Sequence, residues 1–169
     1  MNDTDIQQLT SLLRKLKPGF LPFDIFIEIA RLTVLPIIEF VPLRMYDGKV
    51  EVLLLPRSQD DKFWPGQLHT PGTVIRATDT DEGRHTAFGR ITKNELKDTA
   101  IGEPHYVGSS LNKSKRGMEQ ILIFWVEVKS EPRAGSFYKA SQLPELLMES
   151  QRGFISQALK SYFDFKAQV

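Results

Sequence analysis

One glutamate stands on the apolar face of a predicted helix, and its position needs a chemical explanation. The helix falls within the stretch from His69 to Gly102. On a helical wheel Glu95 lies at about 80°, between Ile91 at about 40° and Phe88 at about 100°. A carboxylate in such surroundings loses solvation worth several kcal/mol unless a cation or hydrogen bonds replace the water. We therefore expect a cation or a hydrogen-bonding partner beside Glu95.

The boundaries of this helix bring a second conflict to the same place. Asp79 and Glu82 have the spacing of a reciprocal N-terminal cap, and the helix is expected to end near Ala100 to Gly102. Glu95 and Asp98 then fall in the last turns, where the helix dipole disfavours a negative charge by up to about 1 kcal/mol. Two local rules are broken at one position, and such conflicts tend to mark function.

The spacing of the charged residues resembles the Nudix box, a family signature that runs G, five residues, E, seven residues, R-E-U-x-E-E-x-G-U, with U aliphatic. Glu82 precedes Arg90 as the first glutamate of the signature precedes its arginine. Ala87 takes the small position, and Glu95 takes the last glutamate position. The run from Ala87 to Leu96 is similar to the helix of GDP-mannose mannosyl hydrolases, a Nudix branch that also lacks part of the glutamate set.

The box is degenerate, and its register has an alternative. Four signature positions carry other residues: Ile91 and Asn94 stand for glutamates, Lys97 for the glycine near the end, and Thr73 for the first glycine. Extra residues also lie between Thr73 and Glu82. A second register lays residues 94–99 on R-E-U-x-E-E, which keeps Glu95 but loses Glu82 and Arg90. We prefer the first register because it retains more of the signature.

The resemblance implies a hydrolase that uses Mg²⁺ or Mn²⁺ to act on a nucleoside diphosphate linked to another group, such as the sugar of a nucleotide sugar. It implies a metal site made by Glu82, Asn94 and Glu95, with a backbone carbonyl near Gly72. A metal ion in this site would neutralise diphosphate oxygens and orient the substrate. The expected partner is therefore a small-molecule nucleoside diphosphate derivative.

Three further residues take catalytic roles in this interpretation. Arg57 ends an apolar run before a polar loop, where the resemblance implies an arginine that faces the diphosphate; a solvated arginine explains the pattern equally well. Arg90 either stabilises charge on the leaving group or orients a glutamate of the box. Glu131 is the titratable candidate in the late loop 131–136, where many Nudix enzymes carry their general base.

A second interpretation is a catalytically inactive Nudix-fold module for ligand binding or regulation. The glutamates missing at positions 91 and 94 favour it, whereas the retained Glu82, Arg90 and Glu95 favour the enzyme, which we prefer. The histidines do not decide between the two interpretations. His69, His85 and His105 lack the spacing of metal ligands, and a structural role is more common for each than that of a general base.

Periodicity predicts an α/β fold that begins with two helices, one from position 3 or 4 to Leu16 and one from Pro22 to position 29 or 31. Strands are predicted over residues 32–46, 50–55, 104–111, 118–128 and 137–140, and a C-terminal helix over 143–165. Asp47-Gly48 predicts a hairpin turn. Pro36 and Pro42 indicate that the first strand has bulges or lies at an edge.

The resemblance covers roughly Leu32 to Phe165 and implies a Nudix-type α/β/α sandwich with a mixed β-sheet and extra N-terminal helices. We expect residues 1–31 to form a helical extension and residues 32–169 a Nudix-like domain. Because the second helix is apolar on all sides, we also expect a homodimer that buries Phe23, Phe26 or Ile27.

Composition limits the class of partner. The chain has 169 residues, 41% of them hydrophobic, which suffices for a real core. The net charge of +1 argues against nucleic acid or an anionic membrane as partner, and the basic turn 112–117 is expected to be a solvated face, the alternative being a phosphate-recruiting loop. The absence of cysteine, of a signal peptide and of a long apolar run predicts a cytoplasmic protein.

Overall fold

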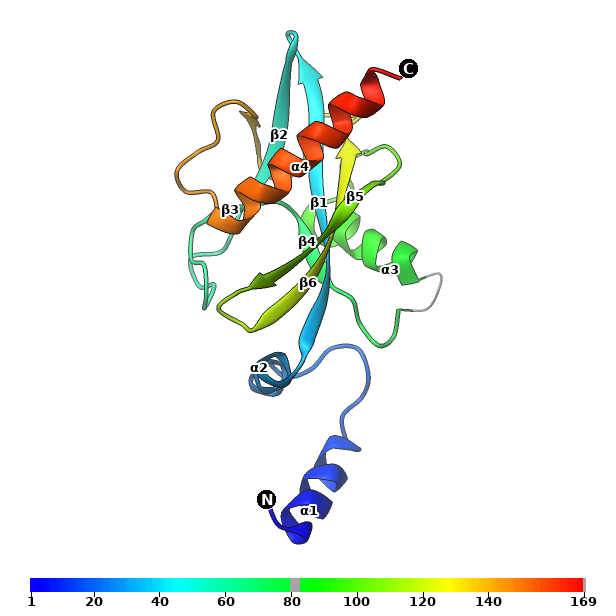
Figure 1. Ribbon diagram of the computed structural model, residues 1–169, viewed down its shortest axis with the longest axis vertical. Helices are drawn as coiled ribbons and strands as arrows, with labels where there is room; N and C mark the ends of the chain where they lie inside the picture. Colours follow the sequence, from blue (N-terminus) through cyan, green and yellow to red (C-terminus); the bar gives the residue numbers. More distant parts are fainter. Residues whose placement is uncertain (80–82, 169) are drawn as a thin grey trace.

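The long strand β1 is the element to which the rest of the sheet is attached. In the computed structural model, which describes residues 1–79 and 83–168, seven strands form one mixed sheet with helices on both faces (Figure 1). The elements, in chain order, are α1 (Asp3–Leu13), α2 (Phe23–Leu32), β1 (Val34–Tyr46), β2 (Lys49–Pro56), β3 (Leu68–His69), β4 (Gly72–Val74), α3 (Gly83–Arg90), the π-helix η1 (Ile91–Glu95), β5 (His105–Lys113), β6 (Met118–Glu127), β7 (Ser136–Lys139) and α4 (Glu149–Lys166).

β1 has partners along both of its sides. It runs parallel to β6 from Val34, opposite Met118, to Leu43, opposite Glu127. On its other side β1 pairs antiparallel with β4 and then with β2. The sheet order is β3-β2-β1-β6-β5, with β7 attached to β2. The edge position expected for this strand is therefore wrong, because β1 is central.

The two prolines of β1 cost no hydrogen bond of the ladder. Phe40 N donates to Pro71 O at 2.8 Å, and Ile75 N donates to Pro36 O at 2.8 Å. Even-numbered residues thus direct their backbone groups toward β4 and β2. Pro42 falls between the pairing with β4 and the pairing with β2, and Pro36 lies just before the pairing with β4. Because Pro36 lies at the end of one pairing and Pro42 lies between two, neither missing N–H interrupts a pairing in its middle.

The predicted hairpin between β1 and β2 is confirmed. Asp47 has a φ of 48° and Gly48 a φ of 69°, so both central residues of the turn are left-handed. This is the geometry of a type I′ turn, whose twist matches that of the flanking strands.

The sheet separates two apolar cores, which confirms the α/β/α sandwich with a mixed sheet. Side chains of β1 alternate between the faces because the side-chain period of a strand is two. Ile37 and Val41 belong to the core that packs against α4, where Tyr162 is fully buried. Ile38 and Phe40 belong to the core on the other face; that core also holds Ala87, Ile91 and Leu96 from α3, η1 and the residue that follows.

The end of α1 and the start of α4 differ from the positions that the sequence predicts. α1 ends at Leu13 rather than Leu16, and α4 begins at Glu149 rather than near position 143. The residues before α4 form a turn and then a bridge to β3: Leu68 N donates to the carbonyl of residue 146 at 2.9 Å, and Met148 N donates to Leu68 O at 3.0 Å. This pairing takes the backbone groups that an earlier helix start would have used.

The N-terminal helices differ in how they contact the body of the molecule. In Figure 1, α1 stands apart, and its apolar residues, such as Ile6 and Leu9, are about half exposed. α2 lies against one end of the sheet, and its Ala30 is fully buried. Phe23 stays 41% exposed and Phe26 packs on the core, so the homodimer remains a prediction. Within the described residues, no helix is both long and apolar enough to cross a membrane.

α2 and the chain before it touch two loops of the sheet domain at glycines. A Cβ at Gly117, in the hairpin between β5 and β6, would lie 2.3 Å from the carbonyl oxygen of Ala30. A Cβ at Gly19 would lie 3.3 Å from the Thr78 side chain, after β4. Both glycines have positive φ, at +144° and +113°. These close approaches fix the extension against the loops.

We expect Gly117→Ala to destabilise the protein by about 2 kcal/mol or more, because the new methyl group collides with backbone atoms of α2. Gly48→Ala is the control, since Gly48 also has a positive φ but no atom within 4 Å of an added Cβ. Urea unfolding measures both changes. Hydrogen exchange in α2 should rise in Gly117→Ala alone, and equal exchange in the two variants would contradict the contact with α2.

Candidate functional site

A cavity of about 560 Å³ lies between the N-terminal extension and strands β1 and β4. One part of its wall is apolar, and it combines side chains of the extension with those of the sheet: Phe20, Leu21, Phe23, Phe26, Ile29, Val34, Leu35, Ile37, Val74 and Ile75. The other part is polar and includes Glu39, Arg57, Thr70, Gly72, Thr73 and Arg116. Of the predicted site residues, the cavity thus brings Arg57 and Gly72 together.

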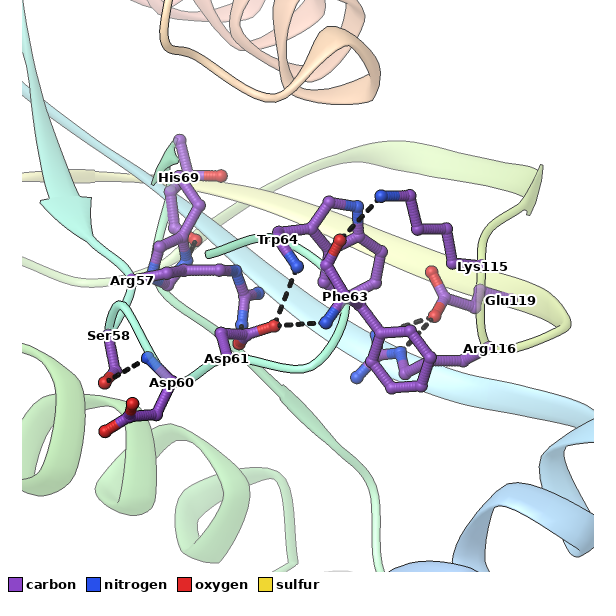
Figure 2. A network of polar contacts seen from close by, with 11 residues as sticks. Arg57, Ser58, Asp60, Asp61, Phe63, Trp64, His69, Lys115, Arg116 and Glu119 are labelled. Carbon is purple, nitrogen blue, oxygen red and sulfur yellow. Dashed lines mark hydrogen bonds and ion pairs between the residues drawn. The ribbon is translucent and has the colours of Figure 1, made fainter. Parts of the chain in front are cut away.

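Arg57 follows β2 and is held by the loop after it (Figure 2). Its Nη1 donates to Asp61 Oδ2 at 3.0 Å, and its guanidinium lies 5.1 Å from the centre of the Trp64 ring. Asp61 also accepts from the backbone N–H groups of Phe63 and Trp64, at 2.9 and 2.8 Å. Burial raises the pKa of Asp61, but these donors and Arg57 lower it more, so the carboxylate stays ionised.

One nitrogen of Arg57 is left without a partner. Its Nε is buried and makes no hydrogen bond within the described residues. A buried donor of this kind costs free energy until a ligand or water satisfies it. Arg57 therefore keeps binding capacity that the protein itself does not use.

The hairpin between β5 and β6 brings a second arginine to the same end of the cavity. Arg116 donates through Nε and Nη2 to Glu119 Oε1, at 2.9 and 2.6 Å, and its guanidinium lies 5.2 Å from the Trp64 ring centre. Lys115 Nζ donates to Phe63 O at 2.6 Å (Figure 2). The basic turn is thus tied to the loop of Arg57, and Arg116 lines the cavity rather than a solvated face.

Glu39 is a buried carboxyl at the polar end of the cavity. It lies in β1 opposite Gly72 of β4, and only 6% of it is exposed. A Cβ at position 72 would lie 2.3 Å from Glu39 Oε2, so glycine is required there for the carboxyl to fit. Thr70 and Gln151, the latter from α4, complete the buried group.

Burial and hydrogen bonding act in opposite directions on the Glu39 carboxyl. Gln151 Oε1 accepts from Thr70 N at 3.1 Å and also contacts Thr70 Oγ1, to which it offers no proton. The Thr70 hydroxyl lies within hydrogen-bond distance of Gln151 Oε1 and of Glu39 Oε1, and it donates to Glu39 Oε1 at 2.5 Å. Burial raises the pKa of Glu39 to about 7, although Thr70, Gln151 and two arginines lower it.

The histidines are accounted for by structure where their side chains are described. His69 is buried, and its Nδ1–H donates to Thr70 O at 2.7 Å. Burial, with the charge of Arg57, lowers the pKa of His69 to about 4, so it is neutral at pH 7. His105 stacks on Trp125 with ring centres 3.8 Å apart. The His85 side chain lies outside the described part.

Arg90 is bound to the loop before its helix. It donates to both oxygens of Asp79, at 2.5 and 3.0 Å, and to Val74 O at 3.0 Å. The Asp79 carboxylate also accepts from Arg76 N at 2.9 Å, and Arg90 lowers its pKa. The described part of α3 begins at Gly83, and Glu82, the expected partner of an Asp79 cap and a predicted metal ligand, lies outside the described residues.

The helix changes its period after Arg90, which the helical wheel did not anticipate. Leu96 N donates to Ile91 O at 3.0 Å, five residues back, as in a π-helix. Ile91 and Leu96 are both fully buried, although an α-helix would place them about 140° apart. Glu95 is consequently half-buried beside Leu96, and Asn94 is exposed.

Glu95 faces the same guanidinium as Glu39. Burial raises the pKa of Glu95, and the charges of Arg57 and Lys97 oppose that rise. No hydrogen bond or ion pair reaches its carboxylate from residues 1–79 or 83–168. The partner that the sequence predicts for Glu95 is thus the nearby charge of Arg57, without a direct contact.

The helix ends at Glu95, earlier than predicted, because the next residues leave the helical region. Lys97 and Asp98 have φ values of 52° and 58°. Left-handed backbone favours glycine, and Lys97 stands at the glycine of the signature in the preferred register. The backbone conformation thus agrees with that register, although the glycine itself is absent.

Glu131 lies apart from the other predicted site residues. Its side chain is 90% exposed, its nearest cation is Arg44 at 3.6 Å, and it does not line the cavity. Arg44 is itself bound to Glu51 at 2.9 Å and stacked on Phe137. The role of general base for Glu131 remains a prediction.

Comparison with known proteins shows which solved structures have a similar architecture. Neither a scan against protein-family models nor a search of curated proteins gives a match. A mutT/nudix family protein from Listeria innocua matches with a TM-score of 0.63 and 14% identity, over 81% of this chain and 99% of that one. The Nudix domain of NrtR from Shewanella oneidensis, solved with ADP ribose, matches with a TM-score of 0.58 and 14% identity, over 96% and 99%. The chain has the Nudix fold.

A third Nudix-fold neighbour is the Ap4A hydrolase of C. elegans, with a TM-score of 0.58 and 16% identity over 78% of this chain and 99% of that one. Identities this low establish the fold and leave the activity open. Within the described residues, no group of three or more His, Asp or Glu side chains could hold a metal ion. Of the side chains predicted to bind the metal ion, Glu95 is the carboxylate that belongs to the described residues.

Sequence analysis missed Glu39, Thr70 and Gln151. Glu39 carried a signal, because it interrupts the apolar run Ile37–Val41, and a charge inside a strand buried on both faces needs partners. Thr70 and Gln151 carried no such signal, because the hydrogen bond between them depends on how α4 packs on the sheet.

Glu39→Gln should make stability less dependent on pH. The pKa of Glu39 is about 7 in the folded protein against its usual 4.5, so the folded state holds an extra proton between these values and stability falls as pH rises through them. Glutamine keeps an acceptor toward Thr70 but cannot ionise. Between pH 5 and pH 8 the variant should gain about 2 to 3 kcal/mol over the wild type in urea unfolding. Glu103→Gln, at an exposed site, is the control, and a difference that does not change with pH would contradict the raised pKa of Glu39.

Lys97→Gly should stabilise the protein by about 0.5 to 1 kcal/mol, because glycine accepts a φ of 52° without the strain that a side chain imposes. Lys93→Gly is the matched control; this exposed lysine lies inside η1, where glycine costs about 1 kcal/mol. Thermal unfolding distinguishes the two. Destabilisation by both variants would mean that the left-handed turn is not part of the folded state.

Proposed function

We propose that this protein is a Mg²⁺-dependent Nudix-type hydrolase that cleaves a nucleoside diphosphate linked to another group, such as a nucleotide sugar. One observation carries the proposal. Arg57 stands at the polar end of the cavity, within electrostatic reach of both Glu39 and Glu95, and its buried Nε has no partner within the described residues. A guanidinium with free donors suits the oxygens of a phosphate.

The cavity supports a ligand with one charged and one apolar part. Its volume of about 560 Å³ falls within the usual range of small-molecule sites. Arg57 and Arg116 stand at one end, each already paired with a carboxylate, so the free site is not strongly positive. A diphosphate would bring the negative charge that both guanidinium groups can share.

The donors suit a Mg²⁺ ion that keeps most of its water. The half-buried Glu95 has a carboxylate without a hydrogen bond from the described residues, and Mg²⁺ is commonly bound by one or two carboxylates together with substrate phosphates. Glu82, Asn94 and a backbone carbonyl near Gly72 are the further ligands that we propose. When bound, the ion neutralises diphosphate oxygens.

We propose separate roles for three residues of the chain in binding, positioning and proton transfer. Arg57 binds the diphosphate and offsets charge on the leaving group. Arg90, held by Asp79 and Val74 O, positions the segment between β4 and α3. Glu131 is the residue that we propose to take a proton from the attacking water, as a phosphorus–oxygen bond of the diphosphate breaks.

A second candidate is a binding or regulatory module without catalysis. Its specific support is Asn94, which is exposed where the signature has a glutamate, and Ile91, which is fully buried in the core where the signature has another. The NrtR Nudix domain was solved with ADP ribose, so a ligand of that class suits this candidate as well.

Turnover of at least one diphosphate compound should require a divalent cation. A panel of nucleotide sugars and dinucleotides is assayed with Mg²⁺ and with excess chelator. Glu95→Gln should lower kcat/KM by about 100-fold, which corresponds to about 2.7 kcal/mol of metal-dependent stabilisation. Asp98→Asn is the matched control, because position 98 is acidic in the alternative register, and it should change kcat/KM little. A large loss in Asp98→Asn alone would establish the other register.

Thermal melts with and without Mg²⁺ separate the two candidates from a structural Glu95. At ten times its Kd, Mg²⁺ should stabilise the wild type by about 1.4 kcal/mol and Glu95→Gln far less. Without metal, Glu95→Gln should be as stable as the wild type or up to about 1 kcal/mol more stable. A loss of stability regardless of metal would refute the metal site, and ligand-induced stabilisation without turnover would establish the binding module.

A further inference from the structure

We propose that the segment Pro18–Ile29 of the N-terminal extension binds the flat aromatic ring of the ligand's nucleobase, with Phe20 as the stacking partner. The inference deepens the proposed function and rests on it for the diphosphate, but not for hydrolysis. It assigns a binding role to residues outside the Nudix-like domain expected from position 32 onward.

The two ends of the cavity define the ligand's shape. Glu39, Arg57 and Arg116 lie at the polar end, whereas the extension contributes phenylalanine, leucine and isoleucine side chains to the apolar end. A ligand that fills both ends must join an anionic group to an apolar or aromatic one. A nucleoside diphosphate joins these two parts in one molecule.

The extension is attached to the loops that carry the charged groups. The end of α2 touches the hairpin of Arg116 through the close approach of Gly117 to Ala30. Phe23 packs on Phe63 in the loop of Arg57, with ring centres 6.1 Å apart. These contacts hold the apolar wall and the two arginines in one fixed arrangement.

The chemistry of the apolar end favours a ring over a sugar. Its polar side chains are Thr33 and Arg76. The Thr33 hydroxyl donates to Ile29 O at 3.0 Å, and the Arg76 guanidinium lies 5.7 Å from the centre of the Phe20 ring. The hydroxyls of a sugar would find few partners here, and unpaired polar groups cost about 1 to 3 kcal/mol each. A nucleobase presents two apolar faces and keeps its polar atoms at its edge.

Phe20 is the aromatic side chain best placed for stacking. It lines the cavity yet is 80% exposed, so it contributes little to the core. Bases commonly stack on exposed aromatic rings in this manner, and the stacking is worth about 1 to 3 kcal/mol. Because the side chain is exposed, its replacement should leave the fold intact.

The test compares two probes, ADP and inorganic pyrophosphate, by calorimetry on the full chain with Mg²⁺. Phe20→Ala should weaken ADP binding by about 5- to 100-fold and leave pyrophosphate binding unchanged. Phe20→Trp should retain ADP affinity, whereas Phe20→Leu, which is apolar but not aromatic, should not. Phe163→Ala, at a half-exposed phenylalanine of α4, is the control and should bind both probes as the wild type does.

Each other outcome has a definite meaning. If Phe20→Ala weakens both probes equally, or if Phe20→Leu binds ADP as the wild type does, base stacking on Phe20 is refuted and the proposed function stands. Binding of pyrophosphate but not of ADP by the wild type also refutes the base site alone. If no member of the panel of diphosphate compounds binds the wild type, both proposals fail.

Discussion

Most of this structure depends on the enclosure of β1. The strand has β6 along one side, β4 and β2 along the other, and an apolar core on each face. A polar side chain in its middle therefore loses most of its contact with bulk water and has to find partners inside the protein. Glu39 is that side chain, and the arrangement of Thr70, Gln151 and Gly72 around it follows from this constraint.

The charges around the cavity follow a related rule. Arg57 is paired with Asp61 and Arg116 with Glu119, and both guanidinium groups flank the Trp64 ring. Pairing keeps each cation in place at little cost, because the desolvated charges are offset locally. Donors that these pairs do not use, such as Arg57 Nε, are the ones available to a ligand.

Periodicity and turn chemistry sufficed to predict the order of the elements and the sandwich, because alternation along strands and the Asp47-Gly48 turn are local signals. The two prolines predicted either bulges or an edge position for β1, and the edge position is wrong, because whether a strand needs a given N–H depends on its neighbours. The helix around Glu95 was predicted with the wrong period. The π-helical hydrogen bond from Leu96 N to Ile91 O follows from the packing of both side chains in one core. The periodicity of a single sequence carries no information about that packing.

The site residues show the same division between local and distant signals. Arg57 and Gly72 were expected from the resemblance of short stretches of sequence to a family pattern, and both line the cavity. Gln151 belongs to the last helix and meets Thr70 only after the sheet has formed. The sequence around Thr70 and Gln151 gives no local signal of this contact. For Glu39, the apolar neighbours in the sequence were such a signal.

The parallel pairing of β1 with β6 also has a consequence for the rate of folding. Val34 lies opposite Met118, so a long loop must close before this ladder gains its first hydrogen bond. Chains rich in such distant contacts fold slowly compared with helical proteins of similar size. Glu39, Arg116 and Gln151 come together only when that slow step is complete, so the ability to bind a ligand arises late, together with the fold as a whole.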